Sequence, residues 1–183
     1  MIAPKGPALS DLPSANITRF SPSPQASLSS AEGERPHPPR SIDEQLFDNA
    51  AELKVAVASV IMHLSLEWRD VIFQQLDELL SRENWQDDSA FINKTTFMNF
   101  LRFIIYARPT RLPSLGVGPT EHILAAWGTP DCQVSVEFLF DDRAAATFVH
   151  KGGRAREAVA WRGHVADLRN FLLRNDMISA LQE

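Results

Sequence analysis

The chain has 183 residues, a net charge of −5, 44% hydrophobic residues and a single cysteine, Cys132. This size fits one domain with an extension and excludes a large multi-domain enzyme. A lone cysteine excludes an internal disulfide and a cysteine-rich zinc site, which is typical of a protein from the reducing cytoplasm. The acidic balance argues against a nucleic-acid partner, because phosphate binding depends on clustered Lys and Arg. No apolar run approaches the ~20 residues that a membrane span needs.

Residues 1–40 contain eight of the twelve prolines, with serine and other small residues between them. Such a segment buries too little apolar surface to offset the entropy of ordering, so we predict a disordered tail. Its first 31 residues hold seven serines and one acid, Asp11, a composition similar to that of bacterial type III export signals. An export signal therefore stays open beside a plain disordered extension.

Apolar residues at steps of three and four predict three helices within residues 41–108. Ser41 is a suitable N-cap for the first helix, and the second is expected to begin at Ser65. The third helix is apolar on more than one side, which predicts that it is the most buried, and Pro109 marks its end. Its N-cap is expected at Asp87, Asp88 or Ser89.

Residues 109–121 are rich in Pro and Gly and are predicted to form an extended linker. Alternating apolar residues then predict four short strands, joined by turn sequences of hairpin length, at 123–127, 134–140, 144–150 and 158–161. A last amphipathic helix at 165–172 is expected to cover the sheet. The fold class is therefore α+β: a three-helix unit (41–108), then a four-stranded antiparallel meander closed by a helix (109–183). Its core is expected to include Phe100, Leu101, Ile104, Val136 and Phe138.

A resemblance rests on three segments, PSLGV at 113–117, HILAAW at 122–127 and SVEFLFDD at 135–142. Together they resemble a loose group of small bacterial proteins with a Pro-rich lead-in, a first strand ending in Trp, a Val/Phe second strand and an acidic turn. Some members of that group lie near toxin–antitoxin or mobile genes. The resemblance implies a bacterial protein with an antitoxin-like or immunity-like role, and it brings no catalytic residue with it.

The sequence predicts no catalytic residue, no metal ligand and no cofactor. A thiol–imidazole pair would need Cys132 held beside His122, His150 or His164, and their spacing enforces no such contact. No two histidines have a spacing that fixes a metal. The segment 116–118 lacks the third glycine of a phosphate loop and precedes a strand.

The hypothesis that remains is a non-catalytic module that binds another protein stoichiometrically. Aromatic and arginine side chains supply most of the energy at binding hot spots. The partner-binding candidates are Trp127 and Trp161, if both lie on an exposed sheet face, and Arg154 and Arg156 at a basic hairpin tip. Core tryptophans and a solvated turn are the alternatives for these residues.

Two further possibilities stay open. Residues 41–108 hold eleven acids against six bases, which fits a basic partner or a solvated acidic face. The rival functions are a type III-type translocated effector, with residues 1–40 as its export signal, and a small enzyme whose site assembles only in the fold.

Overall fold

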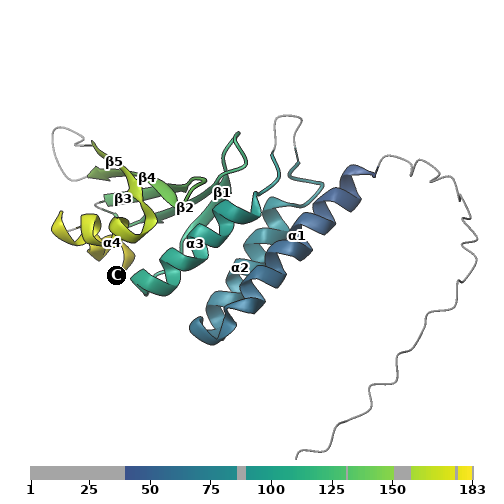
Figure 1. Cartoon of the computed structure of the whole chain (residues 1–183), viewed down its shortest axis with the longest axis horizontal. Helices are drawn as coiled ribbons and strands as arrows, with labels where there is room; N and C mark the ends of the chain where they lie inside the picture. Colours follow the sequence, from purple (N-terminus) through teal and green to yellow (C-terminus); the bar gives the residue numbers. More distant parts are fainter. Residues whose placement is uncertain (1–39, 86–89, 131, 151–157, 176, 183) are drawn as a thin grey trace, which may run out of the picture. The chain divides into compact units, whose positions relative to one another are not determined.

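Three helices form the N-terminal half of the part that the computed structural model describes, namely residues 40–85, 90–130, 132–150, 158–175 and 177–182. Helices α1 and α2 pack against each other, and α3 lies between them and the sheet (Figure 1). A fourth helix, α4, packs on the last two strands. The helical bounds are α1 Ile42–Ser59, η1 Ile61–His63, α2 Leu66–Leu79, α3 Lys94–Ala107, α4 Val165–Arg174 and η2 Ile178–Leu181, where η marks a 3₁₀ turn.

Side-chain caps fix where the first two helices begin. Ser41 accepts a hydrogen bond from the Glu44 amide at 3.2 Å, and the Glu44 carboxylate accepts one from the Ser41 amide at 3.0 Å, which is a capping box. Ser65 accepts from the Trp68 amide at 3.3 Å at the start of α2. The predicted N-cap Ser41 and the predicted start of the second helix at Ser65 are confirmed, and Ser65 is the N-cap of α2.

The predicted cap of the third helix is wrong. Asn93 occupies that position, and its Oδ1 accepts from the Thr95 amide at 2.8 Å. Asp87, Asp88 and Ser89 lie outside the described residues, and residues 90–93 are not helical. The apolar pattern misplaced the start because Phe91 and Ile92 pack against the core from an irregular segment.

The sheet has five strands instead of four, in the order β1-β2-β3-β4-β5, and every neighbouring pair is antiparallel. The additional strand lies inside the segment that was predicted to be a linker. The strands are β1 Ser114–Val117, β2 Ile123–Gly128, β3 Cys132–Phe138, β4 Arg143–His150 and β5 Ala158–His164. The α+β class and the meander are as predicted, and the strand count is corrected.

One face of the sheet packs on the helices. α3 contacts β2 and β3, and α4 contacts β4 and β5. Phe138 of β3 meets the rings of Phe100 and Phe103 at centroid distances of 5.6 and 5.7 Å. The five residues predicted for the core are all buried. Among the described residues, no helix is long and apolar enough to cross a membrane.

Candidate functional site

Trp127 belongs to the core and not to an exposed recognition face. Its side chain is 1% exposed, and its ring meets Phe103 edge-on at 6.0 Å. The indole N–H donates to the carbonyl of Arg111 at 2.9 Å, which satisfies the only polar group of the ring. Because side chains alternate along a strand, Trp127 shares the helix-covered face with Ile123 and Ala125. The exposed face on which its role as a partner-binding candidate depended is therefore not where Trp127 lies, and the alternative of a core tryptophan holds.

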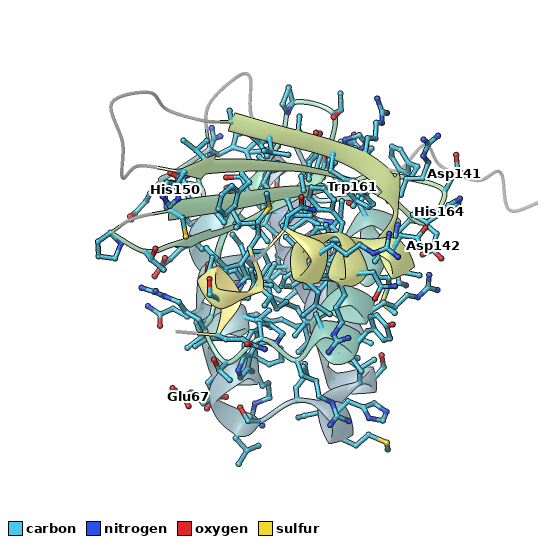
Figure 2. The ribbon with its side chains drawn as sticks, turned by 90° about the vertical axis from the view of Figure 1, so that its left-hand side faces the viewer. Glu67, Asp141, Asp142, His150, Trp161 and His164 are labelled. Carbon is cyan, nitrogen blue, oxygen red and sulfur yellow. The ribbon has the colours of Figure 1, made fainter. Side chains whose placement is uncertain are left out.

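Trp161 also faces the helices. It is half-buried on β5, where Figure 2 labels it. Its ring stacks on Phe171 of α4 at a centroid distance of 5.4 Å and an interplanar angle of 23°. Its register partner is Ala146, which is buried on the covered face. Trp161 therefore closes the edge of the core, and the two tryptophans do not form a surface on the other face.

Arg154 and Arg156, the predicted basic hairpin tip, lie outside the described residues. Their assignment as partner-binding residues stays a prediction from the sequence.

The second face of the sheet has no described helix over it (Figure 1). Its central row runs in register from Ala126 through Ser135 and Thr147 to Ala160. All four side chains are small, so the middle of this face is flat. We call it the open face, and its members on the five strands are Ser114, Gly116, Leu124, Ala126, Gly128, Gln133, Ser135, Glu137, Arg143, Ala145, Thr147, Val149, Ala158, Ala160, Arg162 and His164.

A cluster of side chains around His122 lies at one end of the open face. His122 Nδ1 is 2.9 Å from Glu137 Oε1 and 2.9 Å from Thr120 Oγ1, and Phe140 packs edge-on against the ring at 5.0 Å. The other ring nitrogen, Nε2, is buried with no hydrogen-bond partner among the described residues. Because both polar neighbours meet one nitrogen and the other faces the interior, the ring presents no free nitrogen to a substrate. The cluster ties the β1–β2 turn to β3.

The Cys132 thiol has a threonine and not a histidine as its hydrogen-bond partner. Cys132 is buried, and its Sγ lies 3.1 Å from Thr129 Oγ1. His150 stands opposite Cys132 in the strand register, and its ring stacks on Phe148 at 6.5 Å. No group of three or more His, Cys, Asp or Glu within the described ranges is arranged to hold a metal ion.

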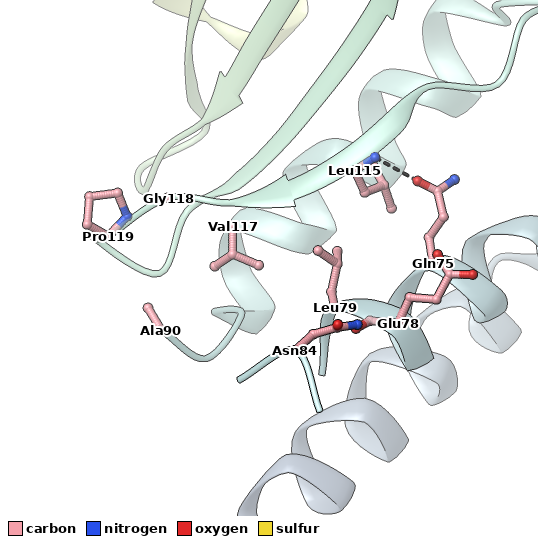
Figure 3. Close-up of a pocket in the computed structure, with 9 residues that line it drawn as sticks. All are labelled: Gln75, Glu78, Leu79, Asn84, Ala90, Leu115, Val117, Gly118 and Pro119. Atoms are coloured by element: carbon pink, nitrogen blue, oxygen red, sulfur yellow. Dashed lines mark hydrogen bonds between the residues drawn. The ribbon is translucent and has the colours of Figure 1, made fainter. Parts of the chain in front are cut away.

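A groove between α2 and β1 was missed by the sequence analysis. The side chain of Gln75 bridges the two elements: its Nε2 donates to the Pro113 carbonyl at 3.0 Å, and its Oε1 accepts from the Leu115 amide at 2.6 Å. Next to this bridge lies a hollow of about 680 Å³, which Figure 3 shows. Its lining residues are Gln75, Glu78, Leu79, Asn84, Ala90, Leu115, Val117, Gly118 and Pro119.

A second hollow, of about 540 Å³, adjoins the first over the outer side of α2 and shares Glu78 and Asn84 with it. Four acids and no base line it: Asp70, Asp77, Glu78 and Glu83. Lys54 pairs with Asp77 from α1 and Arg69 pairs with Asp70, which leaves Glu78 and Glu83 without a basic partner in the ion pairs of the described residues. The acidic excess of residues 41–108 was visible in the sequence, but its position beside an edge strand was not.

No protein-family model, no curated protein and no solved structure matches this chain.

Proposed function

We propose that this protein acts by stoichiometric binding of another protein across the open face of its sheet. The observation that carries the proposal is the one-sided packing: α3 and α4 cover one face, and no described element covers the other. An antiparallel sheet with one free face is stable in water, so this face is available to a partner without prior rearrangement.

The side chains of the open face support contact with a protein surface. Small residues in the central row, such as Ser135, Thr147 and Ala160, let a partner approach the backbone closely. Phe140, 42% exposed beside His122, provides an aromatic anchor at the rim. Glu137 and Arg162 add opposite charges that orient a partner more than they bind it.

This mode of action is that of an antitoxin-like or immunity-like factor, which occupies its target one to one. The proposal commits to that mode of action and not to the identity of the partner. A bacterial origin and a cytoplasmic location belong to the same proposal, and they rest on the resemblance and on the lone cysteine.

Ala160→Arg tests the open face directly. Ala160 is exposed on β5, so a long charged side chain there blocks the flat centre while the helix-covered face is left intact. We expect the affinity for the native partner, isolated with the wild-type chain from source cells, to fall at least about tenfold. The matched control is Ala58→Arg, the same change at an exposed position of α1.

Both variants should melt at the wild-type temperature. Equal binding by the two variants would remove the open face as the interface. Light scattering of the eluted complex should give a one-to-one mass. A time-dependent covalent change in the partner at substoichiometric amounts of this protein would reveal catalysis and contradict the proposal.

A further inference from the structure

Val117 is the residue on the outer edge of β1 whose N–H and C=O both lack a hydrogen-bond partner among the described residues. β1 is the first strand of the sheet, so only one of its sides pairs with β2. The Gly118 amide points inward and donates to His122 at 2.8 Å, whereas the Leu115 amide points outward and donates to Gln75. Backbone groups alternate in direction along a strand, so Val117, two residues after Leu115, also directs its N–H and C=O outward.

At the start of β1, the side chain of Gln75 hydrogen-bonds the outward backbone groups of this edge. Its side-chain amide accepts from one backbone N–H and donates to one backbone C=O, as a neighbouring strand would. Val117 has no such substitute among the described residues. Val117 lines the hollow between β1 and α2, where Figure 3 shows its side chain.

The hollow offers room for a side chain as well as a backbone. The side chains of Val117 and Leu79 face each other across it, and Ala90 lines the same space (Figure 3). A residue paired antiparallel with Val117 would project its side chain to the same face of the sheet. An aliphatic side chain there would be buried against Leu79 and Ala90.

The acidic side chains of the second hollow favour a basic residue in a segment that pairs with Val117. Residues two positions apart on a strand share a face, so the side chain two positions along the segment also projects to the face that α2 packs on, where Glu78 lines both hollows. Glu78 and Glu83 line this second hollow and have no basic partner in the ion pairs of the described residues, whereas Asp70 pairs with Arg69 and Asp77 with Lys54. A Lys or Arg at that position is attracted, and an acid is repelled.

We infer that the outer edge of β1 accepts a short extended segment of a partner protein, with an aliphatic residue opposite Val117 and a Lys or Arg two positions away. The segment adds a strand to the sheet through a pair of backbone hydrogen bonds to Val117. Gln75 ends the pairing at Leu115, and Pro119 has no N–H to extend it, so the register is fixed at one residue. This inference rests on the proposed protein-binding function and assigns it a second contact.

The test begins with a random nonapeptide phage library selected against the full chain. The expected consensus has an aliphatic residue and a basic residue two positions apart. The best peptide is then made synthetically, and its dissociation constant is measured by fluorescence anisotropy.

Val117→Pro removes the outward N–H and leaves the hydrogen bonds of the β1–β2 ladder intact, because that N–H takes no part in the ladder. We expect at least about tenfold weaker peptide binding by this variant. Val117→Thr keeps the N–H and the side-chain shape and should bind within about threefold of the wild type. A peptide N-methylated at the residue opposite Val117 should lose a similar factor against the unaltered protein, which keeps the test valid if the proline variant is unstable.

The charge is tested on one helix. Glu78→Gln, in the groove, should weaken binding of the basic peptide several-fold, whereas Glu67→Gln, in the first turn of α2 and outside both hollows, should not. No enrichment in the selection, an acidic consensus, or peptide binding that is indifferent to Val117→Pro and to N-methylation would each overturn the inference. The open face is judged separately by Ala160→Arg, so the two failures are distinguishable.

Discussion

Gly163 and Trp161 lie two residues apart on the covered face of β5. The indole ring of Trp161 occupies the space where a side chain at residue 163 would lie. A Cβ added at Gly163 would lie 2.5 Å from Cζ2 of Trp161, which is closer than carbon atoms approach each other. The absence of a side chain at residue 163 therefore lets the indole lie flat and stack on Phe171. Here the glycine is needed for a close approach and not for an unusual backbone angle.

Gly163→Ala should lower the free energy of unfolding by about 1–2 kcal/mol, because the methyl group displaces the Trp161 ring from its stack. In a Trp161→Ala background the same change should cost less than about 0.5 kcal/mol, since nothing remains to clash. Urea denaturation of the four proteins measures both costs. Equal costs in the two backgrounds would show that the strain comes from somewhere other than the ring.

Phe138 and Phe140 make a matched pair on one strand and its turn. Phe138 is 0% exposed and meets two rings of α3, whereas Phe140 is 42% exposed. Phe138→Ala should therefore cost about 3–5 kcal/mol, and Phe140→Ala less than about 1 kcal/mol. Thermal melts and denaturant titrations report the difference. A small loss of unfolding free energy for Phe138→Ala would mean that the register of β3 is shifted by one residue.

At the level of elements, the alternation of apolar residues predicted those strands whose own sequence carries the pattern. Val134, Val136 and Phe138 alternate without interruption, so both β3 and its buried face were evident. β1 escaped because Gly116 and the flanking Pro113 weaken its strand signal. It is a strand because Leu115 and Val117 lie opposite Ala125 and Ile123 of β2, a property of pairing and not of the segment itself.

The candidate sites also depend on pairing and packing, which the local sequence pattern does not encode. Alternation placed Trp127 and Trp161 on strands but did not say which face the helices cover, so the sequence did not separate a core tryptophan from a binding one. The open edge at Val117 requires the strand order, and the acids beside it require the packing of α2 on β1. Neither feature is written in the spacing of residues along the chain.

At the scale of the whole molecule, the first described residues make their contacts with other described residues. Arg40 pairs with Asp48 at 2.7 Å, and Ser41 caps α1. Leu46, 3% exposed, is the first buried side chain among the described residues. Each of these contacts is made within α1 or to the helices beside it, so each survives removal of residues 1–39.

Deleting residues 1–39 should therefore leave the melting temperature within about 3 °C of the full chain, because a Pro- and Ser-rich segment contributes little burial. Deleting residues 1–46 is the control: it removes the Ser41 cap and buried Leu46, and it should lower the free energy of unfolding by at least about 2 kcal/mol. Calorimetry and denaturant titration compare the three chains. If the shorter deletion already lost several kcal/mol or its cooperative transition, the first 39 residues would belong to the folded unit, and the boundary predicted near residue 40 would be wrong.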